Sequence, residues 1–167
     1  MFGLAWKRTE EDVRIQVERW ADIAAEAQTI GAEHFAEVEE GLDPRRKFKL
    51  SARLMAALDA VGASLIVTAR VDGLWAGYCT WQITEDVESE GLLIAQQGAW
   101  FVRPQYKDLH LGVPLLKRSI DELKARGVQC IFPHHRMQGR GIRLGLLFQR
   151  LGAVLTQQTY MLWIGED

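Results

Sequence analysis

The stretch 99–127, AWFVRPQYKDLHLGVPLLKRSIDELKARG, constrains the fold more than any other part of this 167-residue chain. Residues 99–102 are apolar and aromatic, which predicts a buried strand that ends at a short polar turn. Apolar residues then recur three or four apart from Val113 to Leu123, which predicts a helix that ends at Gly127. Such a strand–loop–helix unit directs unpaired main-chain N–H groups and the positive end of a helix dipole at the loop. It predicts a phosphate site or, alternatively, an ordinary βα connection.

The composition is that of one soluble globular domain, with 48% hydrophobic and 25% charged residues. A net charge of −2 argues against a protein that coats nucleic acid, although a local basic patch remains an alternative. No apolar stretch approaches the roughly 18 residues of a membrane span, and no signal peptide is evident, so we expect a cytoplasmic protein without membrane contact. Cys79 and Cys130 lie in strand-like runs without zinc-ligand spacing, so two buried thiols and no metal are expected.

The apolar periodicity predicts a mixed α/β (α+β mixed) fold in one domain, 1–167. The expected helices lie at residues 9–33, 43–61, 112–127 and 140–150, with an acidic connector at 34–40. The expected strands lie at residues 64–70, 74–83, 92–102, 128–133 and 153–164. The order α-α-β-β-β-α-β-α-β gives a single mixed sheet with helices on both faces. Residues 71–73 signal a hairpin, Gly98 a bulge, and 128–133 a strand parallel to its predecessor.

This order resembles the GCN5-related N-acetyltransferases, the GNAT fold, and three local sequences support the resemblance. They are VDGLWAGY at 71–78 for the family's "DG.lvGy" hairpin, FVRPQYK at 101–107 for "yV.PeyR", and LFQRLGA at 147–153 for "lYeklGF". The match covers roughly residues 35–165 and leaves the N-terminal helix, 9–33, outside the usual core. More narrowly, the acidic loop, the paired histidines and Tyr160 resemble compact GNAT-like proteins that bacteriophages often encode.

The resemblance implies acetyl-CoA as the cofactor. Main-chain groups of Phe101 and Val102 would contact its pantetheine arm. The family's Q/R-x-x-G-x-G/A pyrophosphate motif falls on the loop and the start of the next helix, at Lys107, Asp108, Leu109, His110, Leu111, Gly112 and Val113. His110 replaces the motif's first glycine, so we expect its side chain to crowd the ligand or to strain the backbone. Asp108 places a negative charge beside the expected pyrophosphate.

Acetyl transfer to an amine requires a base, a donor for the oxyanion and an acid for the leaving thiolate. His134 and His135 follow the strand at 128–133, where the resemblance places the thioester, so either is a candidate catalytic residue; the alternative is a pair that only caps a turn. The family's usual acid is a tyrosine, and Phe148 stands at its position. Tyr160 is the candidate substitute, or else a packing residue, and Tyr78 is expected in the core.

Two charged groups have both a functional and a structural interpretation. The acidic residues of the loop 84–91 offer bases or a surface for a cationic substrate, or form a solvated face; they are Glu85, Asp86, Glu88 and Glu90. The arginines after the histidines offer a site for the adenosine 3′-phosphate or for nucleic acid, or a cationic surface helix; they are Arg136, Arg140, Arg143 and Arg150.

We therefore predict an acyl-CoA-dependent N-acyltransferase that passes an acetyl group directly from acetyl-CoA to an unidentified amine. The first alternative is a catalytically weak or inactive GNAT-fold binding module, with Trp6 and Trp20 on the N-terminal helix as a docking or homodimer surface. The second alternative is a GNAT-like enzyme that modifies nucleobase amines in DNA, which only the arginine cluster favours. The acceptor itself is unknown from the sequence.

Overall fold

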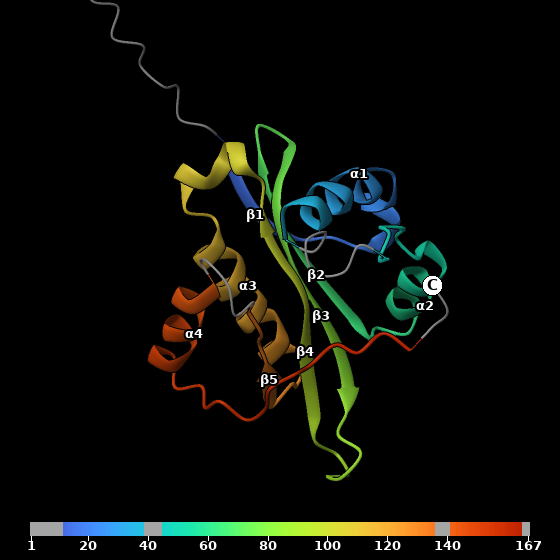
Figure 1. Cartoon of the computed structure of the whole chain (residues 1–167), viewed down its shortest axis with the longest axis vertical. Helices are drawn as coiled ribbons and strands as arrows, with labels where there is room; N and C mark the ends of the chain where they lie inside the picture. The colour runs from blue at the N-terminus through green and yellow to red at the C-terminus, as the bar shows by residue number, and fades with distance from the viewer. Residues whose placement is uncertain (1–11, 39–44, 136–140, 165–167) are drawn as a thin grey trace, which may run out of the picture.

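A five-stranded mixed sheet forms the centre of the molecule, with its strands in the order β1-β2-β3-β4-β5 (Figure 1). The structure, a computed structural model, describes residues 12–38, 45–135 and 141–164. The strands are β1 (Val13–Val17), β2 (Ser64–Val71), β3 (Leu74–Glu85), β4 (Leu93–Val102) and β5 (Cys130–Phe132). Strands β1 to β4 pair antiparallel in succession, and β5 runs parallel to β4. The predicted mixed α/β class is confirmed.

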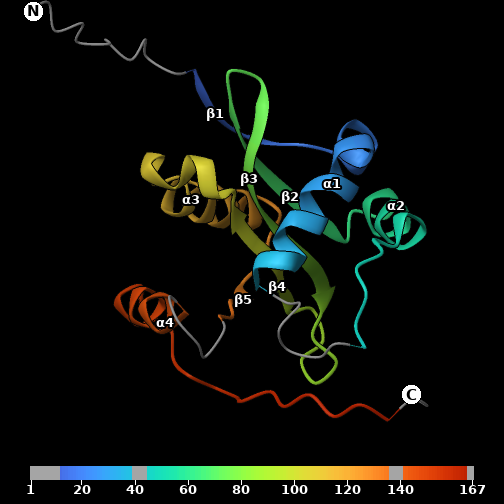
Figure 2. The same cartoon turned by 45° about the horizontal axis from the view of Figure 1, so that its top comes forward.

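Helices cover both faces of this sheet, as predicted (Figures 1 and 2). One face carries α1 (Trp20–Val38) and α2 (Ala52–Ala60), and the other carries α3 (Gly112–Ala125) and α4 (Gly141–Arg150). A short 3₁₀ helix, η1 (Pro104–Leu109), joins β4 to α3. Because side chains alternate along a strand, Leu65 and Val67 pack toward α3 while Ile66 packs toward α1. The core therefore has two layers, one on each face.

The predicted helix at 9–33 is wrong in its first half, where β1 forms instead. The apolar residues of this half fit helical spacing only in part. They also alternate with polar residues, as in an edge strand; they are Val13, Ile15 and Val17. They pair with β2, so that tertiary pairing decides between the two patterns. The helix α1 begins at Trp20 and continues to Val38, through most of the segment predicted as a connector, 34–40.

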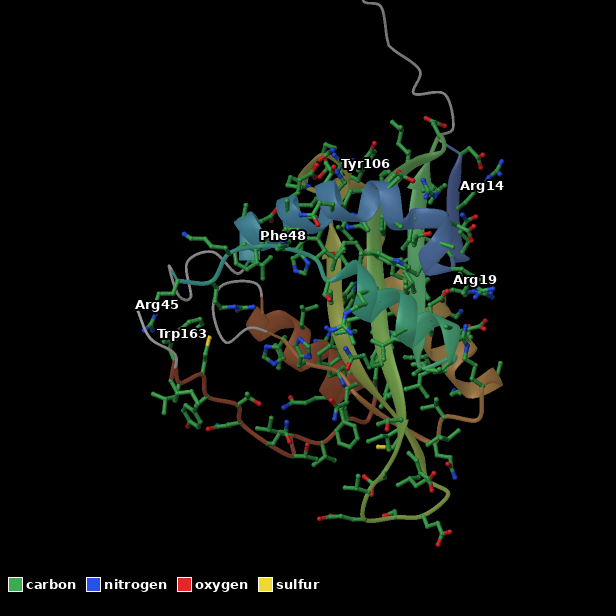
Figure 3. All side chains as sticks on the ribbon, turned by 90° about the vertical axis from the view of Figure 1, so that its right-hand side faces the viewer. Arg14, Arg19, Arg45, Phe48, Tyr106 and Trp163 are labelled. Carbon is green, nitrogen blue, oxygen red and sulfur yellow. The ribbon has the colours of Figure 1, made fainter. Side chains whose placement is uncertain are left out.

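The predicted helix at 43–61 is also too long, since α2 begins only at Ala52. The described residues before it are held by contacts with α1 rather than by helical bonds. The Phe48 ring lies 5.8 Å from the Phe35 ring, and Leu50 N donates to Gln28 Oε1 at 3.3 Å. Figure 3 shows Phe48 lying beneath α1. Non-local packing again overrides the local helical pattern.

The predicted last strand, 153–164, does not form; these residues are exposed and have no regular secondary structure. A β-rich sequence becomes a strand only beside a free strand edge of comparable length, and β5 spans only Cys130–Phe132. The segment instead runs past the sheet to Arg45, whose guanidinium lies 5.0 Å from the Trp163 ring centre (Figures 2 and 3). With β5 left at the sheet edge, Cys130 is exposed, contrary to prediction, while Cys79 is buried as expected.

The hairpin and the bulge are confirmed. Asp72 and Gly73 connect β2 to β3 with φ of 50° and 80°, as a two-residue turn with two positive φ angles requires. In the β3–β4 pair, Thr80 faces Ala99 and Trp81 faces Gln97, which leaves Gly98 as the extra residue of a bulge. A Cβ at Gly98 would lie 2.8 Å from Thr80 Oγ1, so this position excludes a side chain.

Candidate active site

Strands β4 and β5 separate after a short stretch of pairing. Their last paired residues are Gln96 and Phe132, whereas β4 continues to Val102. Pro133 follows Phe132 and has no N–H to continue the ladder, and the bulge on β4 lies just beyond Gln96. The two parallel strands therefore leave a gap between 97–102 and the chain after β5.

The bulge changes which main-chain groups of β4 face this gap. Before the bulge, Leu93 O accepts from Gln129 N at 2.9 Å, so odd-numbered residues face β5. After the bulge, Arg103 N donates to Ala76 O at 2.9 Å, so odd-numbered residues face β3. The extra residue has shifted the alternation of strand bonds by one position.

As a result, the N–H and C=O groups of Trp100 and Val102 face the gap. The main chain of Phe101 faces its partner Tyr78 on β3 instead. Of the two predicted pantetheine contacts, Val102 is thus placed at the gap, and Trp100 joins it. The Phe101 side chain lies on the opposite face, in the core under α1.

Gln97 spans the narrow end of the gap and has an unused acceptor. Its side chain is 8% exposed, and its Nε2 donates to His134 O at 3.2 Å, where main-chain pairing has stopped. Its Oε1 is buried without a hydrogen-bond partner among the described residues. A buried amide oxygen without a partner costs about 1–3 kcal/mol, so this atom is able to accept a hydrogen bond from outside the described residues.

The first turn of α3 lies over the wide end of the gap. A Cβ at Gly112 would lie 3.5 Å from Trp100 Cζ2, in ordinary contact with the ring. The residue before the helix, Leu111, is buried and gives no side-chain cap, and Val113 at the second position is exposed. The amides of Gly112 and Val113 therefore keep their donor capacity for a ligand, with the positive end of the helix dipole behind them, whereas Pro114 has no N–H and Leu115 N already donates to Leu111 O.

His110 has the left-handed conformation, with φ of 52° and ψ of 35°, at the position where a glycine was expected from the motif. Side chains with a Cβ adopt this region at a cost of about 1–2 kcal/mol. The expected backbone strain is present, and the exposed imidazole leaves the space around the loop open.

We predict that His110→Gly raises the free energy of unfolding by about 0.5–1 kcal/mol, because glycine adopts this conformation without the steric penalty. Urea denaturation of the two proteins measures the change. The control is His110→Ala, which retains a Cβ and should give no stabilisation. An equal gain in both variants would show that the imidazole, and not the backbone, carries the strain.

The two cations of the loop are paired with α1. Arg103 forms two bonds of 2.7 Å with the carboxylate of Glu33, and Lys107 Nζ lies 2.5 Å from Glu37 Oε1. The Lys107 side chain is therefore directed toward α1, and its predicted contact with the pyrophosphate stays a prediction. Asp108 is exposed and Leu109 is half-buried against the core.

His134 and His135 follow β5 directly, as predicted. The His135 ring packs against α4, with its centre 6.2 Å from that of Phe148 and its Nε2 2.7 Å from a Cβ built at Gly145. Desolvation by burial, and to a smaller extent electrostatic repulsion from the neighbouring His135, lower the pKa of His134 and so favour its neutral imidazole at pH 7. A neutral histidine beside the gap is competent as a base.

Other predicted site residues lie elsewhere. Tyr160 is 86% exposed in the C-terminal segment, and its hydroxyl donates to Gln158 Oε1 at 3.1 Å. In the acidic loop, Gly91 N donates to Glu85 Oε1 and Glu88 N to Asp86 Oδ1, so these two carboxylates support the turn. Of the arginines, 136 and 140 and the side chain of 143 lie outside the described residues, and Arg150 is exposed.

A cavity of about 590 Å³ lies on the other face of the sheet, between α1, residues 45–50 and strands β2 to β4. Gly98 and Ala99 contribute to its lining, so the cavity meets β4 at the bulge. Figure 3 views this face, with Phe48 beneath α1 and Arg45 beside Trp163 at one end. The bulge therefore contributes to the wall of this cavity, and it belongs to β4, the strand that borders the gap on the other side.

His34 and Tyr78 line the cavity and form a hydrogen bond. His34 Nδ1 lies 2.7 Å from Tyr78 Oη, with the donor set by the tautomer of the histidine. The His34 ring stacks on Phe101 of β4, at 4.8 Å between ring centres and 13° between planes. Burial raises the pKa of Tyr78 well above its ordinary value, so the hydroxyl keeps its proton.

Sequence reasoning missed this pair. His34 fell in a predicted connector and Tyr78 in the predicted core, and they are separated by 44 positions in the chain. The one usable signal was an aromatic and a histidine in two segments that must both face the same layer of the sheet.

In residues 12–38, 45–135 and 141–164, no helix is long and apolar enough to cross a membrane. The same residues contain no group of three or more His, Cys, Asp or Glu side chains placed to hold a metal ion.

No protein-family model and no curated protein matches this sequence. Solved structures do match it. An aminoglycoside acetyltransferase from an uncultured soil metagenomic sample superposes with a TM-score of 0.72 at 14% identity, over 92% of this chain and 99% of the other. A ribosomal-protein-alanine N-acetyltransferase from Brucella melitensis gives a TM-score of 0.65 at 16% identity, over 91% and 99%.

A third similar structure, a predicted acetyltransferase from Clostridium acetobutylicum, was solved with acetyl-CoA. It gives a TM-score of 0.64 at 12% identity, over 90% of this chain and 95% of the other. These similarities span nearly the whole of each chain. The chain has the fold of the GCN5-related N-acetyltransferases, which confirms the resemblance suggested by its motifs.

Proposed function

We propose that this chain is an acyl-CoA-dependent N-acyltransferase that passes an acetyl group directly from acetyl-CoA to an amine. The observation that carries the proposal is the gap between β4 and β5, with an uncapped helix terminus at its wide end. When bound, acetyl-CoA supplies an acetyl group activated as a thioester. The main-chain groups of Trp100 and Val102 would hold its pantetheine arm, and the amides of Gly112 and Val113 would hold its pyrophosphate.

The side chain of Gln97 fits this ligand. Its Oε1 is a buried acceptor without a partner among the described residues, and the pantetheine arm carries amide N–H donors. The same residue donates to His134 O, so its amide is held in one orientation. Gln97 therefore supplies a positioned acceptor at the narrow end of the gap.

We predict that Gln97→Met weakens CoA binding about 10-fold, the effect of losing one buried hydrogen bond to a ligand. Isothermal calorimetry with CoA measures the dissociation constant. The control is Gln96→Met at the neighbouring exposed position, which should bind CoA as the unchanged protein does. If both variants bind alike, Gln97 has no contact with the ligand.

The His34–Tyr78 pair provides a route for the proton of the acceptor. An alkylamine is mainly an ammonium ion at neutral pH and must lose a proton before transfer. In our proposal Tyr78 Oη takes a proton from the acceptor nitrogen while its own proton passes to His34 Nδ1. The hydrogen bond of 2.7 Å and the place of both residues in the cavity support this role. His134 or His135 as the base is the competing assignment.

The test of the function is an acyl-transfer screen with acetyl-CoA, a panel of amines and mass detection of products, combined with calorimetry on acetyl-CoA and CoA. We expect micromolar binding of the cofactor and a mass gain of one acetyl group on at least one amine. The absence of cofactor binding at millimolar concentration would overturn the proposal and favour the binding-module alternative.

One observation supports the binding-module alternative, and a second one counts against it. Phe148, at the position of the family's tyrosine, is 6% exposed and has no proton to donate. Trp20, however, is 7% exposed and packs in the core under α1, so it is not a docking surface. Trp6 lies outside the described residues, and a homodimer through this region stays a prediction.

A further inference from the structure

We propose that residues 153–164 form a homodimer interface, in which the segments of two copies pair as antiparallel strands about a two-fold axis at Gln158. Assembly through this segment goes beyond the proposed function. The segment follows α4 and has no regular secondary structure, although its sequence, AVLTQQTYMLWI, is rich in β-branched and aromatic residues. Figure 2 shows it as an extended trace at the bottom of the view.

The segment presents an unusual number of apolar side chains to solvent. Every residue from 153 to 164 is exposed, and none of them is charged. Six large apolar side chains are each at least half exposed; they are Val154, Leu155, Tyr160, Met161, Leu162 and Ile164. An uncharged surface segment with so many exposed apolar side chains is typical of an interaction site.

The main chain of the segment needs a strand of its own length. The N–H of Ala153 donates to Phe148 O at 3.0 Å, but no main-chain carbonyl of the described residues accepts from the N–H groups of residues 154–164. The edge strands of the described sheet, β1 and β5, span only five and three residues. The same segment in a second copy has the matching length and the same unpaired edge.

The protein holds both ends of the segment. At its start, Gly152 has φ of 87° and its N–H donates to Gln149 O at 2.9 Å, which together with the bond of Ala153 makes the Schellman motif that ends α4. At its end, the Trp163 ring centre lies 5.0 Å from the Arg45 guanidinium. These two contacts fix the direction of the segment between them, so a partner meets a chain that has already lost much of its freedom.

Exposure alternates along the segment as it does in a strand. From residue 160 to residue 164 the exposed fractions are 86, 53, 83, 39 and 90%. Odd-numbered side chains therefore face the protein, and even-numbered ones face solvent. A two-fold axis perpendicular to the paired strands places even-numbered residues beside even-numbered ones, so both copies keep this orientation when they pair.

An axis at Gln158 matches the two segments residue by residue. Residues equally distant from Gln158 on either side then face each other across the pair. Apolar residues meet apolar ones toward the ends, and polar or hydroxyl-bearing residues meet near the centre; the pairs are Val154 with Leu162, Leu155 with Met161, Thr156 with Tyr160, and Gln157 with Thr159. At the axis the Gln158 carboxamide faces its own counterpart, and each carboxamide is able to donate to the other.

The apolar area of the segment suits a dimer of this kind. At roughly 60–120 Å² for each large apolar side chain, the six of both copies together offer about 700–1,400 Å². Stable interfaces bury about 1,200–2,000 Å² in total, with the main chain included. The segment therefore supplies most of the area that a homodimer needs.

Sedimentation equilibrium of the unchanged chain tests the assembly. We expect a dimer of twice the chain mass of 18.9 kDa, with a dissociation constant in the micromolar range. A monomer throughout that range would overturn the inference.

Charge at position 158 tests the axis. Gln158→Glu and Gln158→Lys each place two equal charges opposite one another, so each variant should dimerise at least about 5-fold more weakly. An equimolar mixture of the two should regain the affinity, because unlike charges then face each other. The controls are Gln105→Glu and Gln105→Lys, at an exposed position of η1, which should dimerise as the unchanged chain does. Dimers insensitive to charge at position 158, or a mixture without recovery, would mean that the copies meet elsewhere.

A cross-link tests the distance at the axis independently of affinity. Facing Cα atoms of antiparallel strands lie about 4.5–5.5 Å apart, a separation that a disulfide spans. Gln158→Cys combined with Cys130→Ser should therefore give a two-chain band after treatment with oxidised glutathione, since the remaining Cys79 is buried. Gln105→Cys in the same background should not. Equal cross-linking of the two variants, or none in either, would count against the axis.

Discussion

Tyr78→Phe should lower kcat for acetyl transfer by about 10²-fold, because it removes the hydroxyl that accepts the proton of the acceptor while it preserves the ring. The buried ring packs against Trp75 and Phe101, so the core is retained, and the lost hydrogen bond to His34 costs about 1 kcal/mol of stability. Affinity for CoA should not change. Steady-state kinetics, thermal unfolding and calorimetry give the three values.

Two further variants make this result specific. His34→Gln should show a similar loss of kcat, with a changed dependence of kcat on pH, because the histidine is the second proton acceptor of the relay. Tyr160→Phe, at an exposed position outside the cavity, is the matched control and should retain full activity. Full activity of Tyr78→Phe, together with a large loss in His134→Ala or His135→Ala, would transfer the base role to the histidines after β5.

Gly112→Val should weaken CoA binding by about 10²-fold or more, because the added methyl groups occupy the space between the first turn of α3 and Trp100. A Cβ at this position is only in ordinary contact with the Trp100 ring, at 3.5 Å, so Gly112→Ala should keep the fold, and thermal unfolding measures the cost of the two further carbons of valine. Calorimetry with CoA and thermal unfolding test the two parts of this expectation.

Val87→Ile, which enlarges by one carbon a fully exposed residue of the loop 84–91, is the control and should bind CoA normally. Gly112→Ala should give an intermediate affinity. Normal binding by Gly112→Val would mean that the pyrophosphate does not lie on the first turn of α3.

The parts of the fold with strong local signals were predictable from the sequence. The hairpin at Asp72 and Gly73, the bulge at Gly98 and the helix α3 depend on residues that are close in the chain, and all three are present. The parallel pairing of β5 with β4 followed from the handedness and length of the crossover between them. These features also place the gap and the helix terminus, and thus the proposed cofactor site.

What could not be predicted depends on contacts between distant segments. Strand β1 required the edge of β2 to select an alternating pattern over a helical one, and the residues 153–164 lacked such an edge. The His34–Tyr78 pair required α1 to continue beyond its predicted end and to lie over β3. The hydrogen bonds on both sides of the bulge decide which β4 residues direct their main-chain N–H and C=O groups toward the gap. The sequence does not show these bonds, so the choice of Trp100 over Phe101 could not be predicted from it.

The two ion pairs between α1 and the loop link the halves of the reaction. Glu33 pairs with Arg103 before η1 and Glu37 with Lys107 within it, and His34, the proposed proton acceptor, lies between the two carboxylates on the same helix. Under the proposed function, a shift of the loop when the cofactor binds would therefore also move α1, which lines the cavity. By thermodynamic reciprocity, any factor by which one ligand changes the affinity of the other must be the same in both directions, so measuring it with either ligand added first tests the connection.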